Sequence, residues 1–150
     1  MDKIKVFLKY LFLFILGGSS YVGIELLYRG YSHISMFVVG GCCFLFIGLI
    51  NEILSWETPI ELQILYGLIF TLFIEFVSGC ILNLWLKLDI WDYSNLPFNI
   101  LGQISLLFAI LWIPIILVGI LLDDYTRYYL FGEEKPRYRS WIYEKIKKNK

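Results

Sequence analysis

Long apolar segments, separated by short polar connections, dominate the pattern of hydrophobic and polar positions along this chain. An apolar stretch of about 20 residues can cross a bilayer as a helix, whereas runs of roughly 10–14 more often belong to soluble cores. Four segments are long enough to be predicted membrane spans: residues 10–28, 34–50, 62–86 and 100–122. We therefore expect an all-α, polytopic integral membrane bundle of four transmembrane helices over residues 1–124, followed by a short amphipathic, basic segment over residues 125–150.

Composition agrees with a membrane protein. Of the 150 residues, 59% are hydrophobic and 17% are charged, and the mean hydropathy is +0.69. Soluble domains usually contain about 45–50% apolar residues. The N-terminal basic residues precede an apolar segment that exceeds a usual signal core, and no A-x-A-like cleavage site follows it, so we expect the first span to be retained.

The net charge is zero, but the basic residues are distributed unevenly. Lys3, Lys5 and Lys9 precede the first predicted span, and eight more basic residues follow the fourth. Only Arg29 and Lys87 lie in the connections that would face the other side. Because basic residues near span ends accumulate on the cytoplasmic side, we predict a multi-pass protein of the cytoplasmic membrane with both termini in the cytoplasm.

The C-terminal segment mixes basic residues with aromatic ones, which suits contact with the anionic lipid of a cytoplasmic leaflet. The alternative is that these residues only anchor the topology and have no further role.

Glu75 lies near the centre of the third predicted span, where an ionised carboxylate is disfavoured. Thr71, Ser78 and Asn83 lie at helical spacing from it and share its face, so Glu75 is predicted to point toward protein or water rather than lipid. Desolvation at this depth favours the neutral carboxyl group, which would make Glu75 a protonation switch. We weigh equally a transport role of this kind and a purely structural role in helix packing.

Other predicted spans also carry polar and small residues on one face. Ordered by depth, the polar ones predict a discontinuous polar track whose carboxylates take up protons or weakly hold cations. Candidates for this pathway are Glu25, Arg29, Glu52, Glu75, Ser78, Asn83, Asp92, Asn99 and Gln103. Close helix packing is expected at small residues, namely Gly18, Gly41, Gly48, Gly79 and Gly102. In the loop before the fourth span, Trp91 and Tyr93 are predicted to lie at the outer headgroup level.

The sequence gives little support for an enzyme. It contains no Walker A sequence, no G-x-S-x-G and no H-E-x-x-H. The three cysteines and the single histidine, His33, do not have zinc-like spacing. We therefore expect no catalytic residues, no metal, no cofactor and no nucleic-acid partner.

Three segments of the chain resemble a known family: YVGIELLYRGYSHISMFVVGGCCFLFIGLINE, EFVSGCILNLWLKLDIWDYSNLPFNILGQISLLFAILW and DDYTRYYLFGEE. They are similar to the ABC-transporter type IV family of small bacterial membrane proteins, and the resemblance extends to vertebrate transmembrane protein 229. It covers roughly residues 17–134, and E-x-x-x-G with W-D-Y-S and P-F-N is its most specific part. The residues carried over are Glu25, Arg29, Glu52, Glu75, Gly79, Trp91, Asp92, Tyr93, Asn99 and Gly102.

The resemblance implies a permease-like transporter component. Because this chain lacks a nucleotide-binding sequence, any ATP would be bound by a separate subunit. We expect such a component to act with that subunit or as a homo-oligomer, with Glu75 central and Glu25 and Glu52 toward the two mouths. Two alternatives come from other classes: a holin-like protein that permeabilises the membrane by assembling, and a scaffold that organises a partner or lipid without transport.

Overall fold

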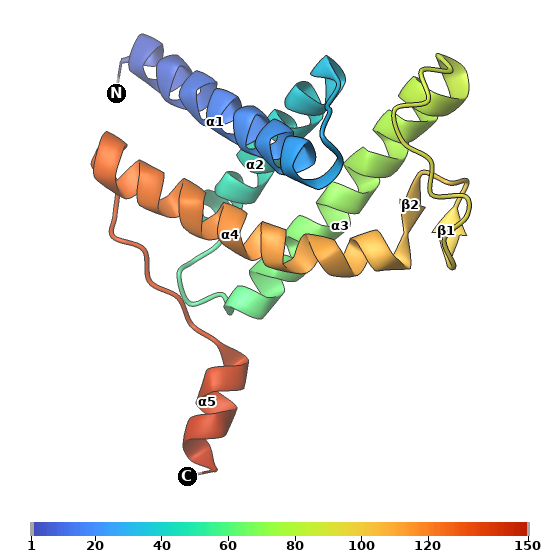
Figure 1. The fold of residues 1–150 in the computed structure, drawn as a ribbon. Helices are drawn as coiled ribbons and strands as arrows, with labels where there is room; N and C mark the ends of the chain where they lie inside the picture. The colour runs from blue at the N-terminus through green and yellow to red at the C-terminus, as the bar shows by residue number, and fades with distance from the viewer. Residues whose placement is uncertain (1, 150) are drawn as a thin grey trace.

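Four long helices and one short C-terminal helix make up the computed structural model, which describes residues 2–149 (Figure 1). All four long helices are long and apolar enough to cross a membrane, which confirms the predicted all-α membrane protein. The helices are α1 (Lys3–Arg29), α2 (Ile34–Ile53), α3 (Ile60–Gly79), α4 (Leu106–Phe131) and α5 (Trp141–Lys148), and α3 continues as a π-helical segment, η1 (Cys80–Trp85).

Local sequence determines where the helices begin and end. The Asp2 carboxylate accepts a backbone N–H from the first turn of α1, and Ser105 does the same for α4. Both helices end at a glycine in the left-handed region, Gly30 with φ of +77° and Gly132 with φ of +68°. Helix α1 therefore includes the three N-terminal lysines, and α4 includes the first residues of the predicted C-terminal tail.

The fourth helix begins at Leu106 and not at residue 100, as the sequence analysis predicted. The preceding residues form two short antiparallel strands, β1 (Asn99–Ile100) and β2 (Ile104–Ser105), in which Asn99 pairs with Ser105. Gly102 lies in their turn with φ of +70°. The prediction that Gly102 packs helices is therefore wrong, because its conformation serves a turn that precedes α4.

Helices α1 and α2 pack closely through small residues. A Cβ at Gly18 of α1 would lie 2.5 Å from the main-chain oxygen of Phe37 in α2. A Cβ at Gly41 of α2 would lie 2.7 Å from the ring of Phe14 in α1. Both glycines thus lie where the two backbones approach each other, as small residues do in membrane helix pairs.

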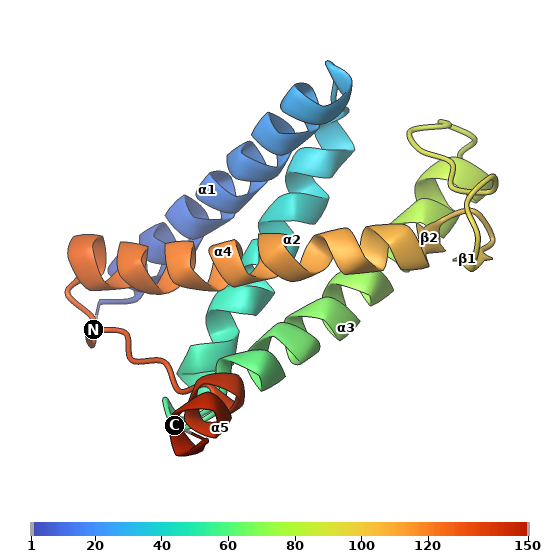
Figure 2. The ribbon, with the colours of Figure 1, turned by 60° about the horizontal axis from the view of Figure 1, so that its bottom comes forward.

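Helix α4 crosses α2 at a steep angle in both ribbon views (Figure 2). Gly48 of α2 faces Asp123 of α4 at this crossing. An apolar core of Ile47, Ile116 and Ile120 fills the space between α2, α3 and α4. Because α1 packs mainly against α2, a seam remains between α1 and α4.

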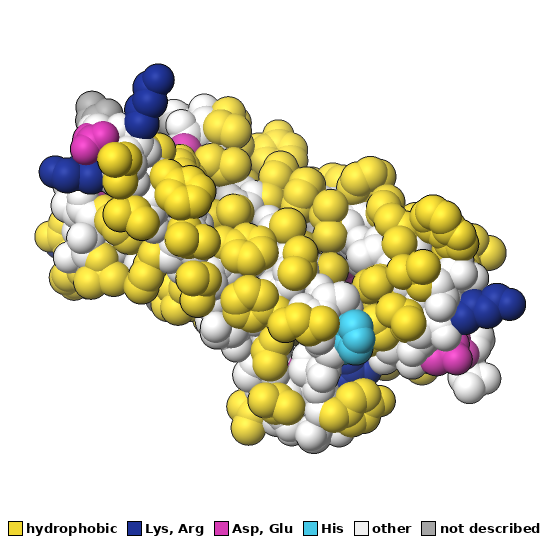
Figure 3. Space-filling view, turned by 90° about the horizontal axis from the view of Figure 1, so that it is seen from above, with side chains coloured by type: hydrophobic (Ala, Val, Ile, Leu, Met, Phe, Trp, Pro, Cys, Tyr) yellow, Lys and Arg dark blue, Asp and Glu magenta, His cyan; other side chains and the backbone are white. Residues whose placement is uncertain are grey.

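The outer surface of the helices is apolar. In the space-filling view, hydrophobic side chains cover most of the visible face, and the charged side chains gather toward its two ends (Figure 3). Large exposed side chains on α1 and α4 include Leu27, Phe7, Val118 and Ile110. Such a surface is suited to lipid contact, because only lipid tails solvate it without cost.

The chain after α4 returns to the connection between α2 and α3. The Ile60 N–H donates to the main-chain oxygen of Arg139 at 2.8 Å. The Glu61 carboxylate accepts from the Ser140 hydroxyl at 2.5 Å and from the Trp141 N–H at 3.2 Å, which anchors the start of α5. Helix α5 projects away from the other helices (Figure 1).

Candidate functional site

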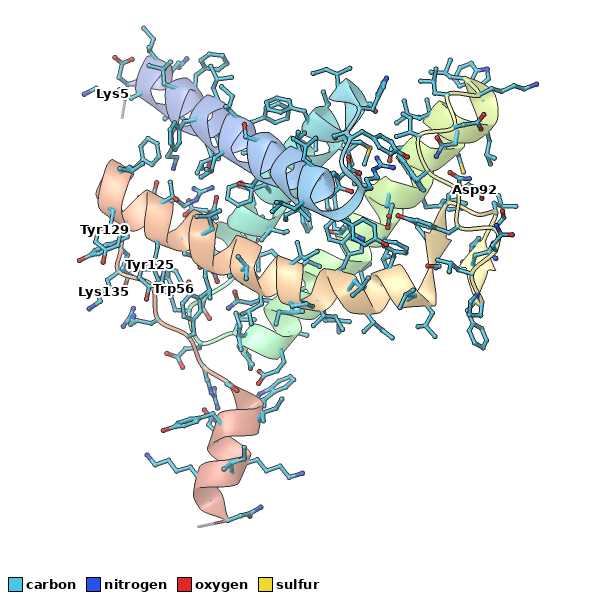
Figure 4. The ribbon with its side chains drawn as sticks, viewed as in Figure 1. Lys5, Trp56, Asp92, Tyr125, Tyr129 and Lys135 are labelled. Carbon is cyan, nitrogen blue, oxygen red and sulfur yellow. The ribbon has the colours of Figure 1, made fainter. Side chains whose placement is uncertain are left out.

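The structure divides the polar residues of the membrane helices between two clusters at opposite ends of the domain. We call the first the Glu75 site, made by Glu25, Arg29 and Glu75 with the loop that contains Asp92. We call the second the Arg127 cluster, which lies where the beginning of α1 meets the end of α4. Its members are Lys9, Glu52, Asp123, Asp124, Arg127 and Glu133. Figure 4 shows Asp92 at the end of the molecule opposite Lys5, Tyr129 and Lys135.

Glu75 projects from α3 into the protein, and only 5% of it is exposed. The Tyr93 hydroxyl donates to Oε1 at 3.1 Å, and the Trp112 indole N–H donates to Oε2 at 3.1 Å. One donor comes from the loop and the other from α4, so the carboxylate joins three parts of the chain. Burial and the nearby Glu75 carboxylate raise the pKa of Tyr93 above its ordinary value, which keeps this hydroxyl a donor.

Glu75 has no basic partner within the described residues, where the ion pairs involve other carboxylates. Arg29, the base that lines the same cavity, is already engaged. Its Nη2 lies 2.8 Å from Glu25 Oε1, and its Nη1 donates to the main-chain oxygen of Ile90 at 2.7 Å. The other Glu25 oxygen accepts from the Ser32 hydroxyl at 2.6 Å. Arg29 therefore balances Glu25 and leaves Glu75 uncompensated.

A cavity of about 390 Å³ lies beside Glu75 in the seam between α1 and α4. This volume falls within the range of roughly 300–1,000 Å³ that is typical of small-molecule sites. Tyr21 stacks on Trp112 with ring centroids 5.6 Å apart, and Tyr93 stacks on Phe108 at 4.2 Å. The aromatic side chains that line the cavity are Tyr21, Tyr28, Trp91, Tyr93, Phe108 and Trp112.

A second cavity of about 290 Å³ continues along the same seam. The two cavities share five lining residues: Tyr21, Ile24, Trp112, Pro114 and Ile115. Apart from Ser20 and the Tyr21 hydroxyl, its side chains are apolar or belong to glycine and cysteine. The seam is thus a mainly apolar space whose charged lining residues are the paired Glu25 and Arg29 and the unpaired Glu75.

The structure differs from the prediction for the aromatic loop residues. Trp91 is 8% exposed and donates its indole N–H to the main-chain oxygen of Gln103 at 3.0 Å. Tyr93 turns inward and donates its hydroxyl to Glu75. A buried indole or phenol needs a partner for its polar hydrogen, and the loop supplies these partners inside the protein.

Among the other predicted pathway residues, Asn83, Asp92, Asn99 and Gln103 stabilise the loop, and neither these four nor Ser78 lines the cavity. Asn83 donates to the Gln103 side chain at 2.9 Å and accepts the Ile90 N–H at 2.7 Å. Ser78 donates to the main-chain oxygen of Glu75 at 3.2 Å. Gly79 faces Gln103 and Trp91 at the same contact.

Asp92 and Asn99 hold the turns of the loop. The Asp92 carboxylate accepts the Ser94 N–H at 2.8 Å, which holds the pKa of Asp92 below its ordinary value. Asn99 donates to the Leu96 oxygen and accepts the Gly102 N–H, at 2.8 and 2.9 Å. Both residues therefore act on loop conformation.

The Arg127 cluster contains Glu52, which the structure separates from the other pathway residues. Asp123 is fully buried, and its Oδ2 lies 2.5 Å from Arg127 Nε. Arg127 Nη1 also lies 3.6 Å from Glu52 and 3.7 Å from Glu133. Lys9 pairs with Glu133 at 2.5 Å, which brings the beginning of α1 next to the end of α4.

Asp124 connects the same cluster to the C-terminal segment. It accepts from the Asn51 amide at 2.6 Å and from the Tyr138 hydroxyl at 2.7 Å. Burial and the Asp124 carboxylate raise the pKa of Tyr138 above its ordinary value. A cavity of about 970 Å³ adjoins the cluster and is lined by Lys9, Arg127 and several carboxylates. Asp123 and Glu133 have basic partners here and Asp124 accepts from neutral donors, and these contacts hold α1, α2, α4 and the tail together.

Sequence reasoning missed Trp112, Lys9 and Arg127. The spacing of Asp123 and Arg127, four residues apart on one helix, was the one available local signal. Trp112 offered none, because it lies 37 residues from Glu75 along the chain.

Comparison with known proteins gives one family. A family model described as "Putative ABC-transporter type IV" matches residues 12–142, which include both clusters except for Lys9. No curated protein and no solved structure matches the chain.

Replacing Arg127 should reveal how strongly the cluster holds the domain together. Arg127→Gln leaves Asp123 buried without its partner, and we expect the free energy of unfolding to fall by about 3–5 kcal/mol. Arg137→Gln is the control, because Arg137 forms an exposed pair with Glu134 and should change stability little. Unfolding in mixed detergent micelles measures both. Equal stability of the two variants would show that the buried pair is not a structural tie.

Proposed function

We propose that this chain, which belongs to the ABC-transporter type IV family, is a permease-like component of a membrane transporter in which Glu75 responds to protons or cations. The observation that supports this most is the position of Glu75, which is buried among transmembrane helices beside a cavity and has no basic partner among the described residues. Ionisable groups inside membrane helices are costly, and they frequently mark substrate or ion pathways and proton relays.

The surroundings of Glu75 allow a change of charge. Two donors, Tyr93 and Trp112, stabilise the ionised carboxylate, and the apolar cavity favours the neutral form or the presence of a cation. These opposing influences suit a carboxyl group that alternates between an ionised form and a neutral or cation-bound form. A structural role alone would require only an acceptor for each donor.

A partner is also part of the proposal. Because the sequence has no nucleotide-binding motif, we propose that a separate ATP-binding subunit or a second copy of this chain completes the transporter. Helix α5 exposes Ile142 and Ile146 together with Lys145 and Lys148. We propose that it lies on the anionic cytoplasmic leaflet, since nearby bases each add about 1 kcal/mol of attraction.

Neutralising Glu75 should abolish transport without removing the fold. In proteoliposomes that contain the purified protein, we expect proton or small-cation flux to fall at least about tenfold in Glu75→Gln, since glutamine cannot exchange a proton. Glu57→Gln, which changes an exposed carboxylate in the connection before α3, should leave flux unchanged. Unchanged flux in Glu75→Gln would remove this residue from the proposed role, and absence of flux in the wild-type protein reconstituted with any ATP-binding subunit that co-purifies with it would favour a scaffold.

The orientation we propose has both termini in the cytoplasm, and it rests on the concentration of bases at the two ends of the chain. In a background without Cys42, Cys43 and Cys80, we expect Asn95→Cys to react with a membrane-impermeant maleimide on intact spheroplasts. A cysteine at Asn149 should react only after permeabilisation. The opposite labelling pattern would reverse the orientation.

A further inference from the structure

We infer that the cavity beside Glu75 binds a hydrophobic organic cation, a protonated or quaternary amine that carries an apolar body. This inference rests on the proposed function and names the class of ligand for the same site. It follows from the charge balance of the cavity, the chemistry of its walls and its position in the seam.

The ionisable side chains that line the cavity leave one carboxyl group without a basic partner. Its charged lining residues are Glu25, Arg29 and Glu75, and Arg29 is held by Glu25 at 2.8 Å. One carboxylate therefore has no counter-charge among the described residues. In an apolar cavity such a group attracts a cation more strongly than it would in water.

The walls select an organic cation over a bare metal ion. Within the described part of the chain, no group of three or more His, Cys, Asp or Glu side chains is placed to hold a metal ion. A dehydrated inorganic cation needs several oxygen ligands, which these walls do not offer. Aromatic rings instead present their negative faces to ammonium groups, and six of them line the space.

The aromatic rings are also held in place. Trp112 is fixed by the hydrogen bond that its indole N–H donates to Glu75 at 3.1 Å and by the stacked Tyr21 ring. Tyr93 is fixed by the hydrogen bond that its hydroxyl donates to the other carboxylate oxygen of Glu75 and by the stacked Phe108 ring. The carboxylate and its two flanking rings therefore form a pre-organised site, which reduces the entropic cost of binding.

The seam gives such a ligand a route from the membrane. Ile24 and Leu111, which line the cavity, are 42% and 43% exposed on the lipid-facing helices. The neighbouring apolar cavity extends the same space between α1 and α4. A cation with an apolar body partitions into the bilayer interface and can reach Glu75 between these helices, whereas a strongly hydrated ion cannot.

Binding of benzyltrimethylammonium tests the inference. In equilibrium dialysis with the purified full-length protein in detergent, we expect saturable binding that weakens at least about tenfold in Glu75→Gln, because the charge pair is lost. Glu57→Gln should bind as the wild-type protein does. Phe108→Leu, which removes one ring but keeps the apolar volume, should weaken binding severalfold.

Two further measurements separate recognition of the positive charge from purely apolar binding and from loss of the fold. Glu75→Asp keeps the negative charge and should retain more binding than Glu75→Gln, which guards against a loss of fold. Neopentylbenzene, the uncharged carbon isostere of the probe, should compete poorly. Equal binding by Glu75→Gln, or equal competition by the isostere, would overturn the inference.

The result of the benzyltrimethylammonium binding measurement is independent of the result of the transport assay. Saturable cation binding without flux would contradict the proposed transport function and leave the ligand class intact. Proton flux that depends on Glu75 without any cation binding would support the transport function and overturn this inference.

Discussion

The hydrogen bonds that Glu75 accepts from Tyr93 and Trp112 connect most of what is distinctive in this structure. A carboxylate within membrane helices needs polar partners, because lipid offers none. Its partners come from the loop before α4 and from α4 itself, so satisfying Glu75 draws both toward α3. The same contacts place the rings of Tyr93 and Trp112 in the wall of the cavity. The need of the Glu75 carboxylate for hydrogen-bond donors thus determines the position of the loop before α4 and the shape of the cavity beside it.

The buried acids Asp123 and Glu75 differ in the partners that the fold gives them. Asp123 is fully buried and is paired with Arg127 at 2.5 Å, while Lys9 pairs with Glu133. The Lys9–Glu133 pair joins the beginning of α1 to the end of α4, and the Asn51 amide of α2 donates to Asp124 of α4. Glu75 has hydrogen bonds but no base among the described residues. This contrast between Asp123 and Glu75 is the basis for proposing that Glu75 responds to a proton or a cation.

The sequence predicted the helices well because the length and apolarity of a span are local properties. It also predicted that Glu75 faces inward, since residues three and four positions apart share one side of a helix. It did not predict the start of α4, because the turn at Gly102 interrupts an otherwise apolar run without a strong local break. The direction of Trp91 and Tyr93 was missed for another reason. Their partners, Gln103 and Glu75, are brought near only by folding, so an interfacial position and a buried one look alike in sequence.

Whether Glu75 is a reachable and uncompensated carboxyl group can be measured by chemical modification in native membranes. Dicyclohexylcarbodiimide is a hydrophobic reagent that adds to carboxyl groups in apolar surroundings, and mass spectrometry of the digested protein locates the adduct. The structure predicts modification of Glu75, protection of Glu75 by benzyltrimethylammonium, and no modification of Asp123, which is held by Arg127. Modification of Asp123 in place of Glu75, or labelling of Glu75 that the cation does not reduce, would contradict the assignment of this site.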